Sequence, residues 1–265
     1  MISFAVTAYN EMTKERKYGA NLLRCIRAAQ EHDQIGQIVI VDDGSADYDH
    51  LVDLLADEPK VHLYHNHENQ GVFSNKLEAI ASCPEGWVIT CDSDNCMNKK
   101  FIDLLANRPK NPSTWYCPSF ASPKFDYRPF IGSYDLKEIG KIIHDPMFDC
   151  LINTGNQTVY RRTFMRVFGK YRGLRADLMM PNYLGTPRSA RGDMYWRLVF
   201  DANDSFIFNL EWLLAGNRLN VARHLEYEHY WTLQDESNYI RAPREKKQLR
   251  HKLNIALAKS IAEIQ

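Results

Sequence analysis

The acidic triplet Asp92-Ser93-Asp94 directly follows an apolar run over Trp87–Cys91. A second acidic pair, Asp42-Asp43, ends the apolar run Gln37–Val41 in the same way. Carboxylates gathered at one place repel one another unless a cation or a ligand that carries one offsets their charge. Because hard oxygen ligands of this kind suit Mg²⁺ and Mn²⁺, the sequence predicts a Mn²⁺ or Mg²⁺ cofactor here.

A third apolar run, Ile2–Thr7, stops at Ala8-Tyr9-Asn10-Glu11. Apolar runs without alternation are typical of strands buried on both faces of a parallel sheet, where ligands bind outside the carboxyl ends of the strands. Tyr9 is then placed to stack on a flat ring of a ligand, although a half-buried core tyrosine is the alternative. Glu11 and Asp43 are short-range hydrogen-bond acceptors that suit hydroxyl groups and a ring N–H. For Asp42-Asp43-Gly44-Ser45, the alternative is a plain turn with an Asx cap.

Helical and strand-like signals alternate through the first hundred residues, which predicts βαβ units and a parallel sheet. Beside the three runs above, the expected elements are helices over 14–31, 51–55, 72–80 and 99–106 and a strand over 61–64. The second half is less regular. We expect an irregular crossover over 108–135, a strand and then a helix within 151–168, a long loop over 169–191, a helix over 205–215, a strand over 218–223 and a C-terminal helix striped from Leu249 to Ile264.

Four motifs in this order resemble family-2 inverting glycosyltransferases of the GT-A fold: Thr7–Glu11, Val41–Ser45, Asn69–Asn75 and Asp92–Asp94. The resemblance is strong over 1–106 and weak over 150–230. It implies an α/β fold with a mixed, mostly parallel sheet flanked by helices. The expected division is a nucleotide-sugar-binding half (1–107), an acceptor-binding and catalytic half of the same domain (108–235) and a C-terminal helix (236–265). The implied reaction moves a sugar, most naturally from a UDP-sugar, to a glycan, lipid-linked or protein acceptor.

The resemblance also assigns roles to single residues. It implies that Asp94 binds the metal, with Asp92 beside the ribose and close to the same ion, and that Asp43 contacts the base. His229 stands where the family has a histidine near the donor phosphates or the metal, and a neutral imidazole is a fair Mn²⁺ ligand. Lys76 could also face the donor, but the favoured interpretation is a solvated lysine. The remaining donor-site candidates are Ala8, Tyr9, Glu11, Asn75 and Ser93.

Inversion by single displacement needs one base on the sugar face opposite the leaving group. The family usually supplies it from a Glu-Asp pair that opens a helix ending at a glycine about 12 residues later. Asn203-Asp204 stands in that position before Gly216, so Asp204 is the expected base and Asn replaces the usual Glu. An N-cap aspartate is the alternative interpretation of Asp204. Asp193 is the rival catalytic candidate.

The composition indicates which partners and which cellular location to expect. Lys plus Arg equals Asp plus Glu at 33 each, which argues against a nucleic-acid partner. The six scattered cysteines, the lack of a signal-like segment and the lack of a membrane-length apolar run predict a cytoplasmic protein. The basic C-terminal helix suits packing on the domain, a homodimer or peripheral contact with an anionic membrane.

Two alternative functions are a nucleotidyltransferase and a degenerate nucleotide- or glycan-binding protein. Nucleotidyltransferases commonly have a Gly-rich, basic loop near the first strand, and this chain lacks it.

Overall fold

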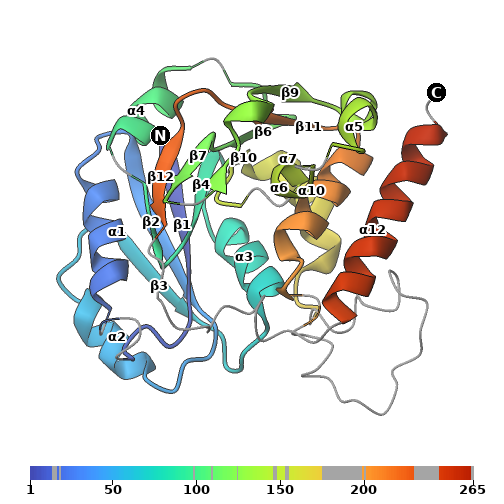
Figure 1. The fold of residues 1–265 in the computed structure, drawn as a ribbon. Helices are drawn as coiled ribbons and strands as arrows, with labels where there is room; N and C mark the ends of the chain where they lie inside the picture. Colours follow the sequence, from blue (N-terminus) through green and yellow to red (C-terminus); the bar gives the residue numbers. More distant parts are fainter. Residues whose placement is uncertain are drawn as a thin grey trace, which may run out of the picture.

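The computed structural model of the chain describes residues 1–13, 17, 19–97, 99–108, 110–123, 125–145, 148–152, 155–174, 199, 201–229 and 245–263. Within them, a central sheet runs through the molecule (Figure 1). Its eight strands, in spatial order, are β3 (Val61–His65), β2 (Ile35–Asp42), β1 (Ile2–Ala8), β4 (Trp87–Asp92), β10 (Thr158–Tyr160), β6 (Thr114–Cys117), β11 (Arg218–Val221) and β9 (Gly132–Tyr134).

The first half of the chain forms the parallel part of this sheet, as predicted. β1 lies between β2 and β4, and both pairs are parallel. The register places Ala8 opposite Asp42 and Thr7 opposite Asp92. The three polar strand ends therefore meet at one edge, because parallel strands that are in register end together.

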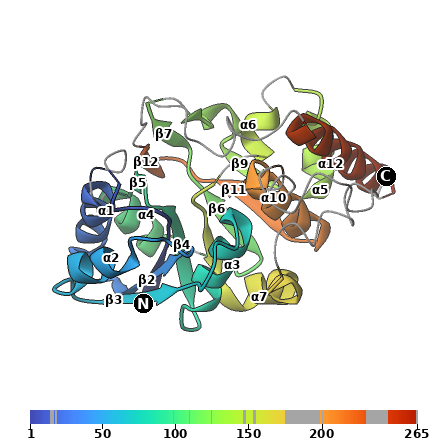
Figure 2. The same ribbon diagram turned by 90° about the horizontal axis from the view of Figure 1, so that it is seen from below.

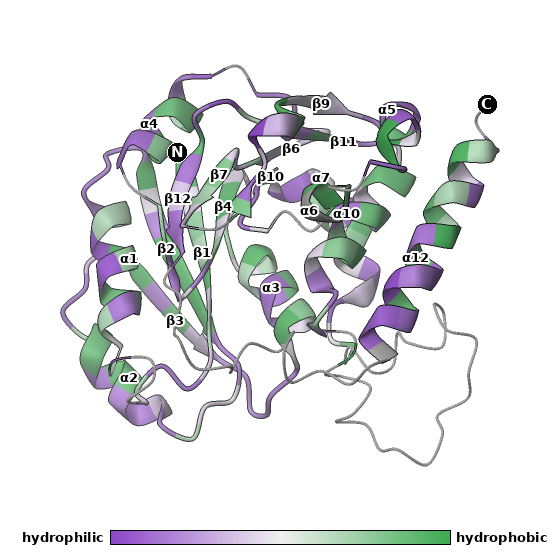
Figure 3. Ribbon diagram, viewed as in Figure 1, coloured by the Kyte–Doolittle hydropathy of each residue, from purple (hydrophilic) through white to green (hydrophobic). Residues whose placement is uncertain are grey.

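Helices cover both faces of these strands, which explains the unbroken apolar runs (Figure 2). In β1, Phe4 and Val6 pack into the core formed with α1, α2 and α4, whereas Ala5 faces the core under α3. Figure 3 shows the central strands β1 and β2 as mostly hydrophobic. The helices are α1 (Ala20–Gln30), α2 (Tyr48–Leu55), α3 (Val72–Ala81) and α4 (Lys99–Asn107). The predicted first helix therefore begins six residues later than expected.

The expected irregular crossover over 108–135 is wrong, because it contains short strands. β6 and β9 join the central sheet, and two others enter a second sheet with the order β5-β12-β7-β8. The prolines that suggested irregularity lie between the strands: Pro118 follows β6 and Pro123 follows β7. The added elements are β5 (Asn95–Cys96), β7 (Phe120–Ser122), β8 (Phe125–Asp126), η1 (Arg128–Phe130) and β12 (Glu226–His229).

The second half of the chain also supplies helices, and these pack on the face of the sheet that α3 covers. α10 (Asp204–Leu214) buries Trp212 against Trp115 of β6, with ring centroids 4.7 Å apart, so Trp212 belongs to the core as expected. Gly216 follows α10 with a φ of 79°, a conformation that glycine adopts without strain. The remaining helical elements are α5 (Leu136–Ile142), α6 (Phe148–Ile152), α7 (Arg161–Phe168), η2 (Gly169–Tyr171) and α12 (Glu245–Ala262). Most of the loop expected over 169–191 lies outside the described residues.

α12 packs on the domain beside α10 and α5 (Figures 1 and 2). It buries one stripe, Leu249, Leu253, Leu257 and Ile261. Among the described residues, no helix has both the length and the apolar character needed to cross a membrane. Five cysteines of the described part are buried free thiols, as the composition indicated. The domain division, the cytoplasmic location, the membrane contact and the homodimer stay predictions.

Candidate functional site

The turn after β2 is built on two buried carboxylates. Asp42 accepts hydrogen bonds from the backbone N–H of Ser45 at 2.9 Å and from its hydroxyl at 2.5 Å. The Nδ1 of His65, on the neighbouring β3, lies 2.9 Å from Asp42 Oδ2. Asp42 is therefore an Asx-type structural acid that closes its own turn.

Asp43 joins this turn to the start of α3. Its Oδ1 accepts hydrogen bonds from Gln70 N at 2.8 Å and Asn66 Nδ2 at 3.0 Å, and its Oδ2 accepts one from Gly71 N at 2.9 Å. Asn75 strengthens the same junction, because its Nδ2 donates to Val41 O at 3.1 Å. Both predicted donor contacts, Asp43 and Asn75, are thus buried and fasten the loop before α3 to the edge of the sheet.

Gly44 allows that close approach. Its φ is +74°, and a Cβ atom there would lie 2.6 Å from the backbone carbon of Glu68. We expect Gly44→Ala to lower the free energy of unfolding by more than the roughly 1–2 kcal/mol that a left-handed L-residue costs, because the loop must also move. Gly173→Ala is the matched control, since Gly173 has the same φ of +74° with no neighbouring atom within 4 Å. Urea unfolding of both variants checks this, and equal losses would contradict it.

The loop after β1 is tied to both neighbouring strand ends. Ala8 O accepts a hydrogen bond from Asp43 N at 2.9 Å. Glu11 Oε1 accepts one from Ser93 Oγ at 2.5 Å, which links the loop to the acidic turn after β4. Tyr9, in contrast, is 44% exposed and belongs to neither hydrophobic core. Its ring is therefore accessible at the strand edge.

The central feature of the site is a lysine held between two aspartates. Lys76 Nζ lies 3.0 Å from Asp92 Oδ1, at the end of β4, and 2.8 Å from Asp204 Oδ2, at the start of α10. Thr7 Oγ1 also donates to Asp92 Oδ1, at 3.3 Å. The ammonium thus connects the two predicted functional acids, although they are more than a hundred residues apart in sequence.

The interpretation of Lys76 as a solvated lysine is wrong. Its side chain is only 13% exposed. Burial lowers its pKa, but the charges and hydrogen bonds of Asp204 and Asp92 outweigh burial, so the pKa lies above its ordinary value and the ammonium stays charged. The sequence did carry a signal: Lys76 is three residues after Phe73 and four before Ile80, on the apolar stripe of α3. A charged residue in such a stripe needs a partner.

The predicted base Asp204 is the first residue of α10, after the N-cap residue Asn203. It is therefore not the N-cap of that helix, and its carboxylate points instead to Lys76. Asn203 is buried and bonds to α12, where Arg250 Nε donates to its Oδ1 at 2.8 Å. The rival Asp193 lies outside the described residues.

His229 comes to the acidic turn through the second sheet. β12 pairs with β5 so that His229 lies opposite Asn95, the residue after Asp94. The Nδ1 of His229 lies 2.5 Å from Asn95 Oδ1. Because that carbonyl oxygen is an acceptor, Nδ1 donates to it, and a hydrogen bond of this kind commonly fixes the second ring nitrogen of a metal-binding histidine.

The residues fit a metal ion only in part. Within the described part of the chain, no three His, Cys, Asp or Glu side chains form a group that could hold one. Asp92 shares its Oδ1 with the Lys76 ammonium, which repels a cation at that oxygen. Asp94 and His229 stay predicted ligands, and the β5–β12 pairing places His229 opposite Asn95, the residue after Asp94. Mg²⁺ is commonly bound by one or two protein ligands together with waters and substrate phosphates, so a pair is enough when the substrate supplies the rest.

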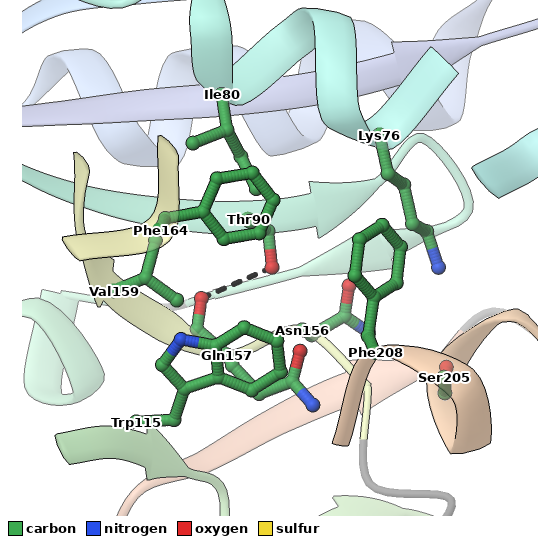
Figure 4. A pocket seen from close by; sticks show the side chains of 10 residues that line it. All are labelled: Lys76, Ile80, Thr90, Trp115, Asn156, Gln157, Val159, Phe164, Ser205 and Phe208. Atoms are coloured by element: carbon green, nitrogen blue, oxygen red, sulfur yellow. Dashed lines mark hydrogen bonds between the residues drawn. The ribbon is translucent and has the colours of Figure 1, made fainter. Parts of the chain in front are cut away.

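Two cavities flank Lys76. One, shown in Figure 4, lies between the sheet, α3 and α10, and Thr90 Oγ1 donates there to Gln157 O at 3.0 Å. Its lining is Lys76, Ile80, Thr90, Trp115, Asn156, Gln157, Val159, Phe164, Ser205 and Phe208. The other cavity is lined by Ala5, Thr7, Lys76, Ala79, Thr90, Cys91 and Asp92. Lys76 lines both cavities, and of the predicted donor-site residues only Asp92 lines either of them.

Open α/β sheets bind their ligands outside the carboxyl ends of the strands. In this chain the acidic residues gather at that edge, so the fold and the site place it among the α/β proteins that bind a ligand there. The family model described as glycosyl transferase family 2 matches residues 3–168, which is more than half of the chain. The chain therefore belongs to glycosyl transferase family 2 and is a glycosyltransferase. No curated protein matches the sequence closely enough to count as a relative.

Solved structures agree on the GT-A fold. The chain is similar to residues 1–349 of TarS from S. aureus in complex with UDP-GlcNAc, with a TM-score of 0.57 and 14% identity over 99% of this chain and 70% of that one. The same fragment in complex with UDP gives the same TM-score and identity. A longer TarS structure gives a TM-score of 0.51 and 13% identity over 95% of this chain and 42% of that chain. These similarities confirm the predicted mixed, mostly parallel α/β fold.

Proposed function

We propose that the chain transfers a sugar from a UDP-sugar to a glycan, lipid-linked or protein acceptor, by single displacement with inversion. The observation that carries the proposal is the Asp92–Lys76–Asp204 bridge, which brings the acidic strand edge and the candidate base to one point. The similarity of the fold to TarS structures that hold UDP-GlcNAc and UDP supports a nucleotide-sugar donor. Membership of the family favours this reaction over nucleotidyl transfer.

The donor is proposed to lie along the edge formed by β1, β2 and β4. Tyr9 offers an exposed aromatic face on which a pyrimidine can stack. Glu11, Asp43, Asn75 and Ser93 hold the loops around it, through the hydrogen bonds described above. Asp92, the acid expected beside the ribose, is linked through Lys76 to Asp204, so the donor would point from Asp92 toward the candidate base.

The diphosphate is proposed to bind beside Asp94 and His229, which would hold Mn²⁺ or Mg²⁺ there. The β5–β12 pairing places His229 opposite Asn95, the residue after Asp94, and the hydrogen bond from His229 to Asn95 orients the imidazole. A bound cation offsets the charge on the diphosphate as the bond to the sugar breaks.

Asp204 is the proposed general base. It stands at the start of α10, and the Lys76 ammonium, 2.8 Å from its Oδ2, fixes the direction in which the carboxylate points. In the reaction it accepts the proton of the acceptor hydroxyl while that oxygen attacks the anomeric carbon, and the nucleoside diphosphate leaves from the opposite face.

Calorimetry with UDP, together with hydrolysis of a panel of UDP-sugars, tests this function. We expect UDP to bind more tightly with Mn²⁺ than with EDTA, and one UDP-sugar to be hydrolysed slowly without acceptor. Asp94→Asn is expected to weaken the Mn²⁺-dependent binding by at least about tenfold, the lower end of what losing a supporting metal contact costs. Asp126→Asn, on the exposed β8, is the control.

Three outcomes of that experiment separate the alternatives. Release of pyrophosphate from a nucleoside triphosphate would favour a nucleotidyltransferase. UDP binding without turnover of any donor would favour a degenerate binding protein. UDP binding that is equally tight with Mn²⁺ and with EDTA would contradict the metal site and leave the transfer reaction to be judged by hydrolysis alone.

A further inference from the structure

The N-terminus of α10 is fixed in an unusual way. Asparagine at an N-cap ordinarily accepts a hydrogen bond from the backbone of its own helix, which is worth about 1 kcal/mol. Asn203 makes no such bond. Its Nδ2 donates instead to Val199 O at 2.9 Å and to Lys246 O at 3.3 Å, in the first turn of α12. The side chain therefore holds two segments together instead of capping its helix.

Arg250 of α12 completes the connection. Its Nε donates to Asn203 Oδ1 at 2.8 Å, and its guanidinium carbon lies 4.7 Å from the ring centroid of Phe206. Arg250 thus contacts residues on both sides of Asp204 in sequence. Figure 3 shows the amino-terminal turns of α12, where Arg250 lies, as strongly hydrophilic. The buried neighbours Leu249 and Leu253 keep this end of α12 against the domain.

The chemistry of these contacts explains why asparagine stands where the family usually has glutamate. The carbonyl oxygens of Val199 and Lys246 each accept a hydrogen bond from Asn203, and an amide N–H₂ supplies the two protons. A glutamate carboxylate has none and would face two carbonyl oxygens. Asn203 is 2% exposed, so water does not replace the missing bonds.

We propose that α12 is a positioning element of the catalytic centre: Arg250, acting through Asn203, holds the first turn of α10 and with it the carboxylate of Asp204. The inference depends on the proposed role of Asp204 as the base. Asp204 is then held from two directions, by Lys76 on the side of the sheet and by the α12 connection on the other side. The C-terminal helix is part of the reaction centre and not only a surface attachment.

Kinetics of Arg250→Met test this role, because methionine keeps an apolar stem and removes the donor. Loss of the connection is expected to lower kcat for UDP-sugar hydrolysis about tenfold, less than the hundredfold that a 1 Å displacement of a reacting group can cost. KM and the Kd of UDP should stay within about twofold, because the donor edge is untouched. Arg250→Lys restores part of kcat, since its ammonium can donate one hydrogen bond. Lys259→Met, an exposed position on the same helix, is the control.

A double-mutant cycle with Asn203→Asp adds a second check. If both residues act through one connection, the double variant loses little more activity than Asn203→Asp alone. Amide hydrogen exchange over residues 203–207 gives a readout that needs no activity, and it should be faster in Arg250→Met than in Lys259→Met. Unchanged kcat and unchanged exchange in Arg250→Met would overturn the proposal, and so would a kcat that falls together with the affinity for UDP.

The same experiment distinguishes this inference from the proposed function. A wild-type protein that hydrolyses no UDP-sugar contradicts the function, and hydrogen exchange then still decides whether Arg250 holds the first turn of α10. An active wild type with equally active Arg250 variants contradicts the positioning role alone. If Arg250→Met does not fold, Arg250→Lys and Asn203→Asp carry the comparison.

Discussion

Asp204→Asn is expected to lower kcat by about 10³-fold, the middle of the range for loss of a positioned general base. Asparagine has the same size and still offers Lys76 an oxygen, so the bridge from Asp92 through Lys76 is preserved in shape. The amide cannot take a proton from the acceptor. Steady-state kinetics with the active UDP-sugar measure the loss, and calorimetry should show that the Kd of UDP is nearly unchanged.

Asp193→Asn is the decisive companion variant. Turnover that survives in Asp204→Asn and is lost in Asp193→Asn would give the base role to Asp193. Glu211→Gln is the matched control for Asp204→Asn, because Glu211 also lies on α10 and pairs with the exposed Lys170 at 3.8 Å. It should leave kcat unchanged.

Lys76→Met has the second largest expected effect. Without the ammonium, the carboxylates of Asp92 and Asp204 face each other with no shared counter-charge. We expect kcat to fall by about 10²-fold, because the base loses the contact that orients it. The free energy of unfolding should fall by at most about 3 kcal/mol, the low end for breaking a buried pair, because solvent reaches Asp92, which is 33% exposed.

Two further variants separate the two effects. Lys76→Met combined with Asp92→Asn removes one of the facing charges, so it should recover part of the unfolding free energy in urea but none of the activity. Lys170→Met, which removes an exposed ion pair to α10, should change neither. If Lys76→Met keeps wild-type kcat, the bridge is only structural and its part in the proposed mechanism fails.

The sequence was a good guide wherever local pattern and local burial agree. The apolar runs predicted β1, β2 and β4 because a strand covered on both faces needs hydrophobic side chains in both directions. The three acidic or polar strand ends followed from the geometry of parallel strands alone. Asp42 could be interpreted as a turn acid because its partner Ser45 is only three residues away.

The prediction failed where contacts join distant segments. The short strands of 114–134 pair with partners far along the chain, such as β6 with β11, and a run of three or four residues carries no period of its own. His229 reaches the acidic turn only because β12 pairs with β5.

What the sequence by itself determined is the list of chemical groups: an aromatic ring, several carboxylates, a histidine and a candidate base, in an order typical of this family. What only the tertiary structure decided is how they are held. Lys76 stays largely buried and charged because two acids from β4 and α10 lie beside it, and their charge outweighs the cost of its burial. Asn203 fits because a helix more than 40 residues later brings a carbonyl oxygen and Arg250 to its amide.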